Sequence, residues 1–277
     1  YIGYRCFWAL WHVTWTILSG VLVYPWYSKE ANRVTWFIYL TNWSYLLLTL
    51  TSLVQVPCCI YYMTKIEGMS ERCQLHVGAL RRPVGLLWCL YNISTSVAIL
   101  VTLGYWLLIY SGGIVYPVDA ATHAVNSVYV IIDLLFTAIP VRLLHFIYPL
   151  IYVIIYALFS AIYQAAGGTN AYDLEYIYSV LDWRNPGRAI LVVFILGIIV
   201  LPLLHTGVFG LYKLRVFTFN KYFPGNNDDI DGAEKYSVNQ QQLDQNNKSG
   251  TNEMSNPVYL ISLTETGTGD KPTTISA

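Results

Sequence analysis

Charged side chains are scarce in this sequence, and they are unevenly placed. Only 12% of its 277 residues are charged, about half the density that is typical of soluble domains. The segment from Pro83 to Val118 contains no Lys, Arg, Asp or Glu. It is longer than the roughly 20 residues that a helix needs to cross the hydrocarbon core of a bilayer. The composition therefore excludes an ordinary water-soluble domain and predicts a membrane protein.

Other features that are lacking exclude further classes of protein. The formal net charge is zero, so no basic excess predicts a nucleic-acid partner. The five cysteines are an odd, scattered set, which does not form a disulfide framework. No histidine cluster has metal-ligand spacing, and the histidines do not pair at both faces as two haems would require, so we expect no metal and no cofactor. Short alternating segments typical of a transmembrane β-barrel are also missing.

Long apolar runs are what the sequence has in abundance, and they predict six transmembrane helices. The runs are Cys6–Tyr24, Val34–Val56, Leu86–Tyr110, Ala121–Ile139, Leu144–Tyr163 and Ala189–Leu211. In lipid the backbone must satisfy its own hydrogen bonds, so such runs become helices in spite of their Val, Ile and Tyr content. We expect an all-α fold, an integral membrane bundle of six transmembrane helices over residues 1–215. We expect residues 216–277, rich in Asn and Gln, to be a disordered cytosolic tail.

Lysine and arginine predict the orientation of these helices. The segments on the side of the N-terminus hold nine Lys and Arg residues, and those on the opposite side hold four. Because cytoplasmic loops carry the excess of positive charge, we expect both termini in the cytosol. We expect the plasma membrane, rather than the endoplasmic reticulum, to be the location.

Polar side chains gather along the fourth apolar run. His123, Asn126, Asp133 and Thr137 follow helical spacing and form one polar stripe, which must face the bundle interior or a water-filled cavity. His123 and Asp133 lie about 15 Å apart along the helix, so they do not form a His–Asp dyad. The stripe predicts either a functional site or polar contacts between helices. A third interpretation, an ion or proton carrier that uses Asp133, is weaker because no charged partner helix accompanies it.

A hydroxyl on the second apolar run matches the depth of this histidine. Thr41 lies about 10 Å below the outer boundary if its helix begins at Val34, and His123 is at a similar depth. An adjacent hydroxyl and imidazole form a nucleophile–base pair, and Asn126 or a backbone amide would then stabilise an oxyanion. The alternative is a Thr41 hydroxyl bonded to a carbonyl of its own helix.

Three segments resemble the rolling-stone family of multi-pass membrane proteins. They are Phe37–Trp43, Asp119–Asn126 together with Asp133, and Tyr178–Pro186. The likeness extends from about Tyr4 to Arg215 and omits the tail. The family is named for a role in myoblast fusion. The resemblance therefore implies a membrane protein that acts in cell–cell fusion or membrane organisation, with membrane lipids as partners of an intramembrane cavity.

The sequence is more distantly similar to the androgen-induced-protein family of six-span enzymes, which hydrolyse fatty-acid esters of hydroxy fatty acids. Thr41, in Leu40-Thr41-Asn42, matches the position of their nucleophile, and His123 matches its histidine partner. An acidic residue follows ten places after the histidine, here Asp133. This resemblance implies an alternative function, an intramembrane threonine hydrolase of fatty-acyl esters.

Two short motifs face the cytosol in the expected topology. Cys58 and Cys59 follow Pro57 at a helix end, a setting for S-palmitoylation, although two small residues at the membrane interface are the simpler interpretation. In the tail, Asn256, Pro257 and Tyr259 form an NPxY pattern. Such a pattern predicts binding to a PTB-type or endocytic adaptor by strand addition.

Overall fold

The computed structural model describes residues 1–27, 33–66, 74–137 and 139–222. The helix packing reported below belongs to one compact unit, Tyr1–Thr218. From residue 223 onward the tail lies outside the described residues, and with it the disorder expected there and the Asn256–Tyr259 motif. The expected domain boundary after residue 215 stays a prediction.

Every described element is helical, which confirms the expected all-α fold. The α-helices are α1 (Ile2–Tyr27), α2 (Leu40–Tyr61), α3 (Gln74–Gly104), α4 (Pro117–Ala120), α5 (Asn126–Phe136), α6 (Ile147–Ala165), α7 (Pro186–Phe194) and α8 (Leu201–Tyr222). Four π-helical segments extend or join them: η2 (Tyr62–Ile66), η4 (Tyr105–Ile109), η5 (Ala121–Val125) and η8 (Ile195–Val200). Three 3₁₀ turns complete the set: η1 (Arg33–Ile38), η6 (Leu143–Phe146) and η7 (Ser179–Leu181).

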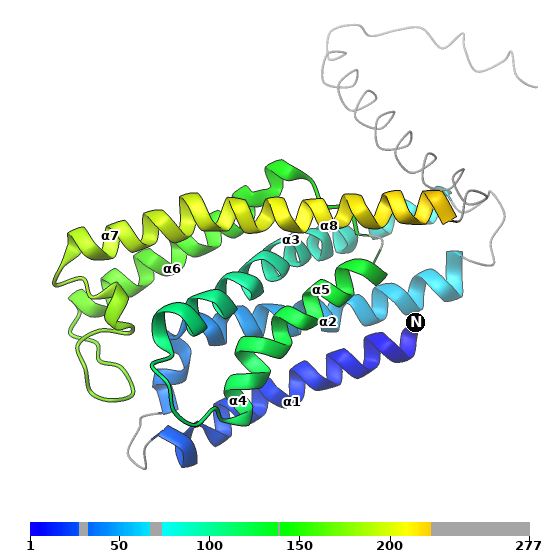
Figure 1. Ribbon diagram of the computed structural model, residues 1–277. Coiled ribbons are helices and arrows are strands. Elements are labelled where there is room, and N and C mark those ends of the chain that lie inside the picture. The colour runs from blue at the N-terminus through cyan, green and yellow to red at the C-terminus, as the bar shows by residue number, and fades with distance from the viewer. Residues whose placement is uncertain (28–32, 67–73, 138, 223–277) are drawn as a thin grey trace, which may run out of the picture. The chain divides into compact units, whose positions relative to one another are not determined.

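Five of the helical stretches are long and apolar enough to cross a membrane. They are Leu40–Thr64, Val84–Ile109, Pro117–Phe136, Leu143–Ala165 and Pro186–Tyr222. The first expected span, Cys6–Tyr24, corresponds to α1, a helix of 26 residues that packs along α2 (Figure 1). Its hydropathy is reduced by polar residues such as Arg5 and His12, both of which are buried.

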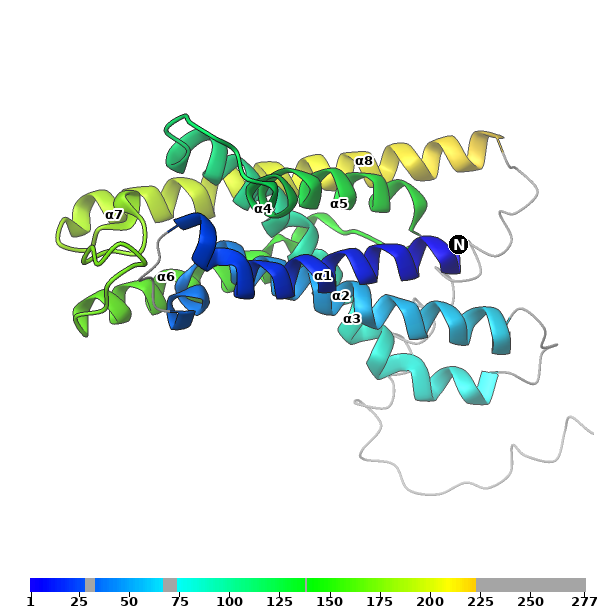
Figure 2. The same cartoon turned by 90° about the horizontal axis from the view of Figure 1, so that it is seen from below.

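Helix α3 lies at the centre of the bundle and joins its two halves (Figures 1 and 2). On one side Ala98 packs with Leu48 of α2 and Tyr129 of α5. On the other side Leu100 packs with Leu150 of α6 and Leu201 of α8. This arrangement explains why the middle of α3, from Ser94 to Ala98, is buried on every side.

The second span begins later than the sequence predicts, at Leu40 instead of Val34. Tyr39 has an extended backbone (φ −86°, ψ 132°), which separates α2 from the 3₁₀ turn η1. The Asn42 side-chain amide donates to the Trp36 carbonyl at 2.7 Å and fixes the turn. Thr41 therefore lies in the first turn of its helix and not two turns inside it.

The two ends of the bundle are formed by different segments of the chain. Tyr1 and the last turns of α8 lie at one end, while the start of α2, the π-segment η5 and the loop between α6 and α7 lie at the other (Figure 1). Because α2 and η5 begin at the same end, the two residues expected to form a nucleophile–base pair are brought to one level.

Candidate active site

The Thr41 hydroxyl and the His123 imidazole are in direct contact. Thr41 Oγ1 lies 3.1 Å from His123 Nε2, although the residues are far apart in the sequence and belong to α2 and η5. His123 is buried and Thr41 is half-buried. The structure thus brings the two predicted residues within hydrogen-bonding distance.

The other ring nitrogen of His123 fixes which way the Thr41 hydrogen bond runs. His123 Nδ1 lies 3.2 Å from the Asp119 carbonyl oxygen, which can only accept. In a neutral imidazole, Nδ1 is then the donor and Nε2 the acceptor. Thr41 O–H must therefore donate to Nε2, and this is the arrangement that a hydroxyl nucleophile and its general base require.

Neighbouring aromatic groups on η4 hold the imidazole in place. The Tyr105 ring stacks on it with centroids 3.7 Å apart and planes 15° apart. Trp106 Nε1 donates to the His123 carbonyl oxygen at 2.9 Å. Both η4 and η5 are π-helical. A π turn is wider than an α turn and is frequent at functional sites, and here two of them face each other across the candidate site.

A cleft opens next to Thr41. Its empty volume is about 670 Å³, part of it open to the outside. Residues of α3, α6, the loop between α6 and α7, α7 and η8 form its walls, and most of them are apolar, among them Leu100, Val153 and Val192. Thr41, Tyr105 and Tyr178 also line it. A cleft of this composition suits an acyl chain, with polar chemistry at one end.

The loop between α6 and α7 brings Tyr178 to the cleft. This loop is tied to α6 by the Gln164 side chain, which donates to Asp182 Oδ1 at 2.7 Å and accepts from the Trp183 backbone N–H at 2.9 Å. The Tyr178 ring packs edge-on against Tyr39, with centroids 5.7 Å apart. Burial raises the pKa of the Tyr178 phenol to about 12, and its hydrogen bonding to Thr41 opposes that shift. Tyr178 therefore lies on the wall of the cleft that Thr41 also lines.

The polar stripe of α5 is buried, but its members serve different contacts. Asn126 Oδ1 accepts from Thr102 of α3 at 3.0 Å and from the Ser127 backbone N–H at 2.7 Å. These bonds direct Asn126 toward α3, one turn away from the Thr41–His123 contact. Asp133 is only 1% exposed, and it lies at the opposite end of the bundle.

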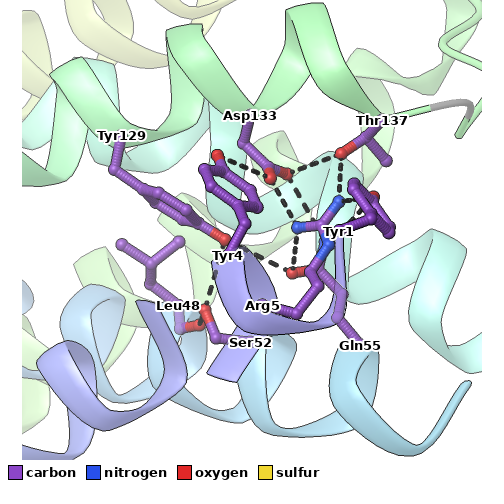
Figure 3. Close-up of polar contacts among 9 residues, drawn as sticks. All are labelled: Tyr1, Tyr4, Arg5, Leu48, Ser52, Gln55, Tyr129, Asp133 and Thr137. Atoms are coloured by element: carbon purple, nitrogen blue, oxygen red, sulfur yellow. Dashed lines mark hydrogen bonds and ion pairs between the residues drawn. The ribbon is translucent and has the colours of Figure 1, made fainter. Parts of the chain in front are cut away.

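Asp133 has a charged partner that the sequence did not lead us to expect. The Arg5 guanidinium of α1 forms an ion pair with its carboxylate (Figure 3). Arg5 also bonds Gln55 Oε1 of α2 at 2.9 Å and the Thr137 hydroxyl. One expectation was wrong here: a charged partner helix does accompany Asp133, because Arg5 of α1 is buried beside it. Through these contacts Asp133 of α5 is linked to α1 and α2.

Two further histidines contact hydroxyl groups in the bundle. Ser96 Oγ lies 3.0 Å from His205 Nδ1, and Tyr45 OH lies 3.2 Å from His12 Nδ1. Ser96 and His205 are at most 1% exposed, and neither pair lines the cleft beside Thr41. A histidine–hydroxyl contact is therefore not enough to indicate a site, and it is the adjoining cleft that distinguishes Thr41 and His123.

The structure shows where Cys58 and Cys59 lie, but it does not test whether they are modified. Cys58 and Cys59 are half-buried near the end of α2, with free thiols, and their acylation stays a prediction. Among the residues that the structure describes, no three His, Cys, Asp or Glu side chains gather as metal ligands do.

Comparison with known proteins identifies the family. A family model described as "Protein rolling stone" matches residues 1–226. Protein rolling stone of Drosophila melanogaster is 34% identical over 231 residues, which is 80% of each chain. The chain belongs to the rolling stone family. No solved structure matches it. The resemblance seen in the sequence is confirmed, and the chain is a rolling-stone-like multi-pass membrane protein.

In this member of the rolling stone family, sequence reasoning missed two residues beside the candidate site, Tyr178 and Tyr105, and the role of Arg5 in the bundle. Tyr178 opens one of the three segments that carry the family resemblance, and that position could have singled it out. Tyr105 gave no signal, because one tyrosine in an apolar run rich in aromatic residues is unremarkable. Arg5 was counted only among the positive charges on the side of the N-terminus.

Proposed function

We propose that this membrane protein is an intramembrane hydrolase of fatty-acyl esters, with Thr41 as nucleophile and His123 as general base. The observation that supports the proposal most is the 3.1 Å contact between Thr41 Oγ1 and His123 Nε2 at the polar end of an apolar cleft. Either feature alone has a structural explanation. Together they supply a nucleophile, a base and a place for an acyl chain.

The reaction follows from the hydrogen-bond directions. Thr41 Oγ1 attacks the ester carbonyl carbon while its proton passes to His123 Nε2, and His123 Nδ1–H remains bonded to the Asp119 carbonyl. The tetrahedral intermediate collapses as the bond to the alcohol oxygen breaks, and His123 returns the proton to that oxygen. Water then repeats the sequence on the acyl-threonine and releases the fatty acid.

The test uses purified protein in detergent with p-nitrophenyl decanoate as the probe. We expect Thr41→Ala and His123→Ala each to remove nearly all turnover, and Thr41→Ser to retain part of it. The double variant should be no worse than the single ones, because residues that act as a unit are not additive. Ser96→Ala is the matched control, since it removes a hydroxyl that contacts a histidine away from the cleft.

Two results would contradict the proposal. One is wild-type protein that releases no p-nitrophenol above the rate of the Thr41→Ala variant. The other is turnover that survives His123→Ala. In either case the Thr41–His123 contact would be a structural link between α2 and η5.

Membership of the rolling stone family supports a second candidate function, a role in cell–cell (myoblast) fusion or membrane organisation through lipid bound in the cleft. The two candidates are separable. If a cell-fusion assay depends on the protein but tolerates Thr41→Ala, the role does not need ester hydrolysis. Loss of fusion with Thr41→Ala, and not with Ser96→Ala, would join them.

A further inference from the structure

The surroundings of Tyr178 assign this residue a part in the chemistry. Tyr178 and Thr41 line the same cleft, and the Tyr178 ring packs against Tyr39, two residues before Thr41, with centroids 5.7 Å apart. The Thr41 hydroxyl has one proton, and this proton is directed at His123 Nε2. Thr41 therefore offers no donor to an oxyanion, whereas the Tyr178 O–H is a donor on the wall of the same cleft.

The start of α2 adds to the electrostatics at this point. Tyr39, at the N-cap, makes no side-chain hydrogen bond to the first turn. The first backbone N–H groups of a helix have no partner within the helix, and they carry its partial positive charge. The Tyr178 ring packs against Tyr39 at this helix start, so charge that develops in the cleft beside Tyr178 lies near a helix end that favours negative charge.

We propose that Tyr178 is a further catalytic residue, whose phenol donates a hydrogen bond to the ester carbonyl oxygen and to the oxyanion that forms there. The inference rests on the proposed function. When Thr41 attacks, the electron pair of the C=O bond moves to the carbonyl oxygen, one bond beyond the new Thr41–carbon bond. The Tyr178 O–H donates to that oxygen while it carries the charge, and this hydrogen bond weakens when the alcohol leaves.

The loop that carries Tyr178 is built to hold such a donor in place. Trp183 Nε1 donates to Ser160 Oγ at 3.0 Å, and the Ala171 backbone N–H donates to the Tyr39 phenol at 3.2 Å. Together with the Gln164 bonds, these contacts tie the loop to α6 and to the residue that precedes α2. A preorganised donor stabilises a developing charge without reorganisation during the reaction.

The experiment compares Tyr178→Phe with Tyr176→Phe, a matched loss of a phenol hydroxyl on the same loop. With p-nitrophenyl decanoate we expect Tyr178→Phe to lower kcat by about 100-fold or more with little change in KM, as loss of one oxyanion donor does. Tyr176→Phe should leave both constants near the wild-type values. Inhibition by decyl trifluoromethyl ketone, which forms a tetrahedral adduct with a hydroxyl nucleophile, should weaken about as much as kcat for Tyr178→Phe alone.

The outcomes separate this inference from the function on which it rests. If Thr41→Ala abolishes turnover but Tyr178→Phe keeps kcat and inhibition, the role of Tyr178 is overturned and the hydrolase remains. If Tyr178→Phe raises KM alone, or lowers the melting temperature together with activity, Tyr178 shapes the cleft and is not a donor. Wild-type protein without esterase activity overturns both.

Discussion

The ring of Tyr105 lies flat against the His123 imidazole, with centroids 3.7 Å apart. A general base must keep its acceptor nitrogen aimed at the nucleophile, and the His123 ring nitrogens contact the Thr41 hydroxyl on one side and the Thr122 hydroxyl and the Asp119 carbonyl on the other. Aromatic pairs contribute about 0.5–1.5 kcal/mol beyond the burial of their area. That energy is available to oppose rotation of the imidazole.

Replacement of Tyr105 should accordingly affect turnover through the ring and not through the hydroxyl. We expect Tyr105→Leu to lower kcat by about 10-fold, which corresponds to about 1.4 kcal/mol, while Tyr105→Phe stays within about a factor of three. Steady-state hydrolysis of p-nitrophenyl decanoate measures both. Equal losses in the two variants would assign the effect to the Tyr105 hydroxyl, which lies against Asp119.

At the scale of the elements, the ion pair between Arg5 and Asp133 joins α1 to α5, with Gln55 of α2 between them (Figure 3). Arg5 is 3% exposed and Asp133 is 1% exposed, so removal of one charge leaves the other buried and uncompensated. Loss of one partner of such a pair typically costs about 3–5 kcal/mol, whereas apolar replacement of both is often neutral.

We therefore expect Arg5→Met and Asp133→Leu to destabilise the bundle separately and to compensate each other when combined. Thermal unfolding in detergent, followed by tryptophan fluorescence, gives the three values. Esterase activity in the double variant should stay near that of wild type, because the pair lies at the end of the bundle opposite Thr41. Additive destabilisation would mean that the two residues act independently.

The loop between α6 and α7 depends on an acidic residue at its base. Hydrogen bonds from Arg184 and Gln164 hold the pKa of Asp182 below its ordinary value. A carboxylate with a lowered pKa stabilises the folded state above its unfolded pKa, near 3.9, and loses this contribution only as the pH falls through the lowered value. Acidification from about pH 8 to pH 5 should therefore leave the loop intact.

Hydrogen exchange at the loop amides tests this expectation. Protection of the Trp183 backbone N–H, which is bonded to Gln164, should be the same at both pH values once the intrinsic exchange rate is corrected. Asp182→Ala should reduce that protection at either pH. Protection that fell between pH 8 and pH 5 in the wild type would assign the loop to a different titrating group.

The sequence predicted the helices well because the physical signal behind them is strong. Apolar runs between polar breaks have no other structure available in lipid. The helix ends were not predicted as well, since Phe37 to Leu40 is continuous in hydropathy and the composition gives no sign of the extended backbone at Tyr39. The sixth expected span ends at Leu211, but α8 continues to Tyr222 because a helix can extend beyond the hydrocarbon core.

The candidate site was predictable in part. Thr41 and His123 could be paired because both begin helices at one side of the bundle, and topology alone gives that level. The partner of Asp133 could not be predicted, since a charge five residues into the sequence has the same appearance in a flank and in a core. Tyr178 belongs to a loop, and hydropathy does not determine how a loop folds back on a bundle.

At the scale of the molecule, Tyr1 and the last turns of α8 lie at the same end of the bundle, which an even number of crossings requires (Figure 2). With the Lys and Arg asymmetry, this predicts that the end with Thr41 faces outward. A tag inserted near Gly112 should be labelled on intact cells, and a tag after Lys248 should be labelled only after permeabilisation. The reverse pattern would place the Thr41 end in the cytosolic leaflet.

The tail beyond the described residues carries its own prediction. If Asn256–Tyr259 is an adaptor motif, Tyr259→Ala should slow internalisation from the cell surface and abolish pull-down of a PTB-type adaptor. Hydrolysis by the purified protein should not change, because the motif is outside the helical bundle. Unchanged surface residence would mean that the pattern arose by chance.

The position of the cleft also determines how the concentration of its substrate must be expressed. Most of its walls are membrane helices, so under the proposed function an ester should reach Thr41 by diffusion within the leaflet and not from water. In reconstituted vesicles the velocity should then follow the mole fraction of ester among the lipids. Addition of inert phospholipid at fixed total ester should slow the reaction, and dilution of the same vesicles with buffer should not.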